Sequence, residues 1–160
     1  MDYLWTPWRY QYVTSAEKSS ECVFCAAARE DDDRGALIVH RGRRNFVILN
    51  RFPYTNGHVM VVPFEHVSML EGLQDETLIE MIRLARDAER HLRALYHADG
   101  LNVGLNMGRS AGAGIASHIH MHVLPRWIGD TNFMTVTAES RVLPETLDVT
   151  WERLHTAFAG

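Results

Sequence analysis

Short apolar runs, separated by turn-forming residues, dominate the sequence between positions 36 and 63. Runs at 36–40, 44–49 and 58–62 are rich in β-branched residues, and Pro63 ends the third. Such runs are typical of strands. Only short links join them, which favours antiparallel pairing of neighbours.

A helical repeat replaces this strand pattern in the middle of the chain. Between 76 and 96, apolar residues recur at helical spacing and arginines fill the opposite face. The pair Asp99-Gly100 ends the segment. We therefore expect a long helix whose apolar stripe consists of Leu78, Ile82, Ala85, Leu92 and Tyr96.

The rest of the chain predicts two strands, at 101–106 and 119–124, a glycine-rich loop between them at 108–114, and a last helix at 145–158. The element order indicates an α+β fold with a five-stranded antiparallel sheet and helices on one side. A length of 160 residues suits a single domain, 1–160, with a C-terminal helical segment at about 144–158.

The charge and cysteine content exclude several classes of protein. The net charge of -4 gives no basic footprint for nucleic acid. No apolar run reaches the length of a signal peptide or a membrane span. Cys22 and Cys25 are too few and too close for a disulfide framework. We expect a cytoplasmic protein with no nucleic-acid or membrane partner, whose cysteine pair is a metal or redox element.

Three histidines in alternate positions are the main candidate for chemistry. His118, His120 and His122 would lie on one face of a strand, with apolar residues on the other. Imidazole has a pKa of about 6.5, and its neutral form can attack phosphorus. Backbone N–H groups of the adjacent glycine-rich loop could bind phosphate oxygens. The spacing alone also allows a three-histidine zinc site or a structural edge strand.

These residues match a known family. The segment at 118–126, His-Ile-His-Met-His-Val-Leu-Pro-Arg, resembles the motif of the histidine-triad family. Segments 46–53 and 57–63 resemble that family's nucleoside-binding strand pair. Segments 4–9 and 127–134 are similar to its bacterial branch that handles diadenosine polyphosphates. The resemblance implies the histidine-triad fold and attack on the α-phosphate of an adenosine compound.

The resemblance also assigns roles to individual residues. His120 corresponds to the nucleophile that forms a nucleotidyl-histidine, and His122 to the histidine near the leaving group. Asn106 corresponds to a polar side chain that meets the phosphate, but the family's dinucleoside triphosphate hydrolases carry a glutamine nearby. The expected catalytic set is His120, His122 and Asn106, and the expected nucleotide-binding set is Asn50, Gly108, Ser110, Gly112 and Gly114.

The family resemblance further suggests what the cysteine pair does. Zinc-bearing members use two cysteines, a histidine after the third strand and the first triad histidine. The corresponding residues here are Cys22, Cys25, His66 and His118. Four protein ligands leave no open position, so a bound zinc would be structural.

The sequence leaves the reaction partly open. The acceptor after attack by His120 could be water or phosphate, and the flanking segments favour a diadenosine polyphosphate as substrate. A nucleoside phosphoramidate hydrolase and a nucleotide sensor with little turnover are the alternatives. The family resemblance implies a homodimer.

Overall fold

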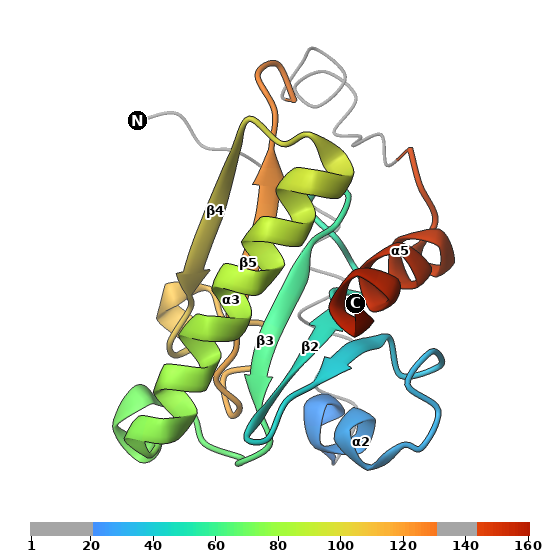
Figure 1. Ribbon diagram of the computed structural model, residues 1–160. Coiled ribbons are helices and arrows are strands. Elements are labelled where there is room, and N and C mark those ends of the chain that lie inside the picture. Colours follow the sequence, from blue (N-terminus) through green and yellow to red (C-terminus); the bar gives the residue numbers. More distant parts are fainter. Residues whose placement is uncertain (1–20, 131–143) are drawn as a thin grey trace, which may run out of the picture.

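A five-stranded sheet forms the centre of the protein, seen in a computed structural model that describes residues 21–130 and 144–160 (Figure 1). The strand order is β1-β2-β3-β5-β4, and every neighbouring pair is antiparallel. The predicted α+β fold is therefore confirmed. The strands are β1 (Ile38–Arg41), β2 (Asn45–Leu49), β3 (Val59–Pro63), β4 (Gly100–Leu105) and β5 (Met121–Arg126).

Helices cover both faces of the sheet. Helices α3 (Asp75–Tyr96) and α5 (Leu147–Ala159) pack on one face, in front of the sheet in Figure 1. Helix α2 (Val23–Arg29) packs its Phe24 against the other face. The expectation of helices on one side only is thus wrong for α2, whose seven residues are too few to show a helical repeat. Because both faces are covered, β2 and β3 are buried along their whole length.

The long helix α3 supplies much of the core. Its predicted stripe is partly wrong, because Ile82 is 59% exposed while its neighbour Met81 is buried. The helix ends at Tyr96, and the next residue, His97, adopts the left-handed conformation that commonly closes helices. The buried residues of α3 are Thr77, Met81, Leu84, Ala85, Ala88 and Leu92.

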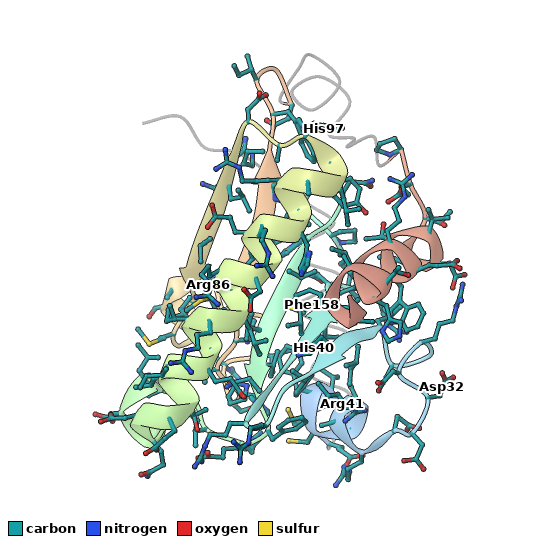
Figure 2. All side chains as sticks on the ribbon, in the orientation of Figure 1. Asp32, His40, Arg41, Arg86, His97 and Phe158 are labelled. Carbon is teal, nitrogen blue, oxygen red and sulfur yellow. The ribbon has the colours of Figure 1, made fainter. Side chains whose placement is uncertain are left out.

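The C-terminal helix α5 fixes the outer strand β1. The indole nitrogen of Trp151 donates a hydrogen bond of 2.8 Å to the carbonyl of Ile38. Figure 2 shows His40 beside Phe158, whose rings stack with centroids 5.0 Å apart. Both contacts hold an edge strand that would otherwise be open to another chain. Among the described helices, none is long and apolar enough to cross a membrane.

A carboxylate from α3 holds the turn between β1 and β2. Glu80 accepts hydrogen bonds from the backbone N–H groups of Arg43, Arg44 and Asn45, at 2.9, 2.7 and 2.7 Å. Burial alone would raise the pKa of Glu80, but these hydrogen bonds and that of the Asn45 side chain outweigh it and lower the pKa. The ionised carboxylate is therefore the form that stabilises the turn.

Replacing Glu80 with glutamine should lower the free energy of unfolding by about 1 kcal/mol at pH 7, because charge-assisted hydrogen bonds are lost. Since the folded-state pKa is lowered, the stabilisation is present above the unfolded pKa of about 4.3 and is lost as pH falls through the folded value. Urea unfolding should therefore show a smaller difference in the free energy of unfolding between the native chain and Glu80→Gln at pH 3.5 than at pH 7. An equal loss in Glu76→Gln, an exposed control on the same helix, would contradict this role.

Candidate functional site

The first two histidines of the triad lie just before β5 rather than within it. The strand begins after His120, later than predicted, and His122 is its second residue. The backbone before the strand is tied to the loop after β3, because the N–H of Ile119 donates to the carbonyl of Val67 at 2.7 Å. Ring centroids of His120 and His122 lie 4.9 Å apart. The segment therefore brings the two rings together without sheet pairing along its whole length.

Hydrogen bonding fixes the tautomer of His120. Its Nδ1 lies 2.8 Å from the backbone carbonyl of His118, which can only accept, so Nδ1 carries the proton. Nε2 is then left with a lone pair. Burial lowers the pKa of His120, whose side chain is 4% exposed, and the hydrogen bond to the carbonyl opposes this shift. A neutral imidazole with Nε2 unprotonated is the state required of a nucleophile.

A fourth histidine sets the tautomer of His122. The backbone N–H of Tyr54 donates to Nδ1 of His58 at 3.2 Å, so His58 carries its proton on Nε2. That Nε2 lies 2.9 Å from Nδ1 of His122 and donates to it. His122 therefore carries its own proton on Nε2. Burial, with a smaller contribution from His120, lowers the pKa of His122 to about 4.

No local sequence pattern indicates this role of His58, because the contact depends on strand register. Met60 of β3 pairs with His122 of β5. His58 lies two positions before Met60, directly before β3 begins. Alternate residues of an extended chain share a face, so His58 meets the triad. Only the pairing of β3 with β5, which no local pattern reveals, places these residues together.

Four side chains form a cluster suited to a metal ion. One ligand atom from each of Cys22, Cys25, His66 and His118 lies within 4.8 Å of all the others. Nε2 of His118 donates to the carbonyl of Pro63 at 2.9 Å, which leaves its Nδ1 facing the two sulfur atoms at 3.3 and 3.6 Å. A tetrahedral ion with sulfur and nitrogen ligands needs separations of roughly 3.5 Å. The cluster thus fits a four-coordinate metal with no open position.

A cleft of about 1640 Å³ lies along the histidines on the face of the sheet that carries α2. Phe24 of α2 contacts the rings of His118 and His120, with centroids 5.4 and 5.0 Å away. The cysteine motif predicts only a metal or redox element in this segment, and nothing in the sequence indicates that Phe24 forms a wall of the cleft. Of the predicted catalytic and nucleotide-binding residues, the cleft is lined by Asn50, Asn106, Gly112, Gly114, His120 and His122, and not by Gly108 or Ser110.

The side chain of Asn50 is oriented by its own turn. Its Oδ1 accepts the backbone N–H of Phe52 at 2.9 Å, and its Nδ2 lies 3.4 Å from Nδ1 of His58. Gly108 and Gly112 have φ values of 82° and 86°, which favour glycine. Both lie in the loop that follows Asn106 and leads to the triad.

The cleft beside the sheet is lined by His120 and His122, and a cluster suited to a metal ion lies next to it. These features define an α+β protein with a candidate active site. The HIT domain matches residues 34–127. This chain therefore belongs to the HIT, or histidine-triad, family. The expected segments 4–9 and 131–134 lie outside the described residues.

Individual relatives agree with this assignment. A protein of Mycobacterium tuberculosis named AP-4-A phosphorylase is 40% identical, covering 98% of this chain and 84% of that protein. A zinc-bound histidine triad family protein from Mycobacterium smegmatis has a TM-score of 0.68 at 29% identity, covering 87% of this chain and 94% of its own. A hypothetical histidine triad nucleotide-binding protein from Sulfolobus tokodaii has a TM-score of 0.68 at 25% identity, covering 86% and 92%.

Replacing His58 with alanine should release the tautomer of His122, because the donor to Nδ1 is lost. Long-range ¹H–¹⁵N NMR at pH 7 should show His122 protonated on Nε2 in the native chain and a mixture in the variant. His58→Gln should restore the native pattern, since an amide can accept from Tyr54 and donate to His122. Protonation of His122 on Nδ1 in the native chain would contradict the hydrogen bond that His58 donates to this atom.

Proposed function

We propose that this chain cleaves a diadenosine polyphosphate, with tetraphosphate favoured, by transferring a nucleotidyl group through His120 to inorganic phosphate. The observation that carries the proposal is the hydrogen bond between Nδ1 of His120 and the carbonyl of His118. It leaves the Nε2 lone pair of a neutral ring facing a cleft large enough for an extended nucleotide. Membership of the HIT family and the likeness to an AP-4-A phosphorylase support the substrate class.

The reaction would proceed in two in-line steps. Nε2 of His120 attacks the α-phosphorus, and the bond to the bridging oxygen breaks. His122, with its proton on Nε2, is suited to donate a hydrogen bond to that departing oxygen, which leaves as an anion while the proton stays on the ring. Asn106 and the N–H groups around Gly112 and Gly114 would stabilise charge on the phosphate oxygens, and Asn50 would contact the ribose. The acceptor then attacks the same phosphorus and releases His120.

Hydrolysis is the second candidate for the final step. Water would give AMP from the nucleotidyl-histidine, whereas phosphate would give ADP. The name of the 40% identical relative favours phosphate. Both outcomes require the same residues, so the products distinguish them.

Incubation with diadenosine tetraphosphate and inorganic phosphate should yield ADP and ATP. The variant His120→Gly should reduce the turnover rate by roughly 10³-fold or more, because the covalent route is lost. Chromatography of the products, with and without phosphate, is the measurement. His97→Ala removes an exposed histidine and should leave the rate unchanged. Turnover by His120→Gly close to that of the native chain would exclude this nucleophile, and AMP plus ATP in both conditions would indicate a hydrolase.

The metal in the cluster is proposed to be zinc in a structural role. Two thiolates and two imidazoles are a donor set that zinc favours, and the similar structure from Mycobacterium smegmatis is described as zinc-bound. The ion would join α2 to the end of β3 and to the start of the triad. It would hold the backbone of His118, whose carbonyl orients His120.

Cys25→Ser should bind zinc substoichiometrically, while the native chain binds one ion per chain. Loss of a structural ion should lower Tm by about 5 °C or more, because binding energy contributes to folding. Elemental analysis and thermal unfolding test this, with Glu76→Gln, which changes an exposed side chain outside the cluster, as the control. Two results would contradict the proposal: a native chain that contains no zinc when purified without chelator, or a Cys25→Ser variant that keeps the Tm of the native chain.

The predicted homodimer and cytoplasmic location stay predictions. Within the described residues, β4 pairs with a single strand, β5, and Val103 on it is 53% exposed. An open strand edge with an apolar side chain is a surface that pairing with a second copy could cover.

A further inference from the structure

Helix α2 forms one wall of the cleft, yet it is too short to keep its position unaided. The residues of α2 that line the cleft are Val23, Phe24, Ala26 and Ala27. A helix of seven residues is not stable in isolation, so contacts with the rest of the chain must hold it. The position of this wall relative to His120 therefore depends on what fixes the two ends of α2.

The cysteine cluster and apolar packing hold the beginning of α2. Cys22 precedes the helix and Cys25 lies within it, and both belong to the four-residue cluster. Phe24 is 3% exposed, packs on apolar residues of the sheet and contacts the ring of His120. These contacts do not reach the other end of α2, where the last carbonyl groups have no partner within the helix.

Arg41 of β1 closes that C-terminal end. Its Nη1 donates to the carbonyl of Ala28 at 2.7 Å, and its Nη2 donates to the carbonyl of Glu30 at 2.8 Å. Its Nε donates to the carboxylate of Asp33 at 2.7 Å, which orients the guanidinium group. A cation at this position also meets the negative end of the helix dipole. Figure 2 shows Arg41 beside α2.

An irregularity in β1 directs Arg41 toward α2. Ile38 pairs with Ile48 on the face of the sheet that carries α2, and the register of β1 with β2 shifts before His40. Residues directly opposite each other in neighbouring strands share a face. Arg41 therefore lies on the α2 side with its partner Phe46, whereas strict alternation from Ile38 would place it on the face of α3 and α5.

The guanidinium group of Arg41 is fully engaged within the protein. All three of its nitrogen atoms donate to the segment formed by α2 and the residues that follow it. The side chain is 30% exposed and does not line the cleft. Any effect of Arg41 on a ligand must therefore pass through α2.

We infer that Arg41 is a positioning residue, which holds the C-terminal end of α2 and thereby fixes the wall of the cleft and the contact of Phe24 with His120. Its effect on turnover rests on the proposed function of His120. The hydrogen bond from His120 to the carbonyl of His118 involves no atom of α2. Loss of Arg41 therefore weakens the binding of a nucleotide more than it impairs the nucleophile.

Hydrogen exchange of the whole chain, followed by mass spectrometry, tests whether Arg41 holds α2. The matched control is Arg34→Gln, because Arg34 pairs with Asp148 and Glu152 of α5 instead. Amides of α2 should exchange about tenfold or more faster in Arg41→Gln, while those of α3 keep their native rates. Arg34→Gln should leave exchange in α2 unchanged. Native exchange of α2 in Arg41→Gln, or equal acceleration in α2 and α3, would overturn the inference.

The ring protons of His120 report the position of Phe24, whose ring centroid lies 5.0 Å away. At constant pH, their NMR chemical shifts in Arg41→Gln should move toward those in Phe24→Leu, which has no aromatic ring at this position. Elemental analysis should find the same metal content in Arg41→Gln as in the native chain. Native chemical shifts in Arg41→Gln would overturn the inference. Loss of metal would also overturn it, because α2 would then be altered through the cysteine cluster.

Nucleotide binding measures the consequence for the cleft. In Arg41→Gln, the Kd of AMP and the KM for diadenosine tetraphosphate should rise about fivefold or more, with kcat within about twofold of the native value. Arg41→Lys should fall between this variant and the native chain, because an ammonium group replaces only part of the fork of hydrogen bonds. Arg34→Gln should match the native chain.

Calorimetry with AMP requires no turnover, so it tests Arg41 even if the native chain forms no ADP and the proposed function fails. Native affinity for AMP in Arg41→Gln would overturn the inference. A fall in kcat with an unchanged KM would overturn it as well, because Arg41 would then act on the reacting groups and not on the wall of the cleft.

Discussion

The hydrogen bond between Nδ1 of His120 and the backbone carbonyl of His118 is the contact on which the proposed reactivity of His120 depends. Without it, either ring nitrogen could carry the proton and the Nε2 lone pair would be present only part of the time. The accepting carbonyl is held by its own peptide unit, because the adjacent N–H of Ile119 donates to Val67. A segment outside the regular sheet thus holds its imidazole through two backbone hydrogen bonds that point in opposite directions.

The four-residue cluster suited to a metal ion and the cleft are structurally coupled, because both depend on His118 and helix α2. The side chain of His118 belongs to the cluster while its carbonyl orients His120. Helix α2 supplies Cys25 to the cluster and Phe24 to the wall of the cleft. An ion bound there would act on the chemistry at a distance by fixing the position of a carbonyl and of an aromatic ring.

Local pattern predicted the sheet and the long helix well, because strand alternation and helical spacing are properties of neighbouring residues. It missed α2, which is short and stabilised by Phe24 packing on the sheet, and it assigned Ile82 to the wrong side of α3. The triad and the cysteine pair were visible as motifs. The contribution of His58 was not, because a hydrogen bond to His122, 64 positions away, depends on how β3 pairs with β5. Arg51 likewise carries no local signal that it lines a cleft.

Reactivity and affinity for a phosphate chain make opposite demands on a site of this kind. A nucleophilic imidazole must be neutral, and burial favours that state by penalising charge. The same burial removes the positive charge that a phosphate chain needs. Placing cations beside His120 would lower its pKa further, but it would also weaken the lone pair as a nucleophile. The cationic side chains that line the cleft among the described residues, Arg51 and Arg109, are exposed to water, whereas His120 is buried. Charge at the rim and neutrality in the interior are therefore complementary conditions for the same reaction.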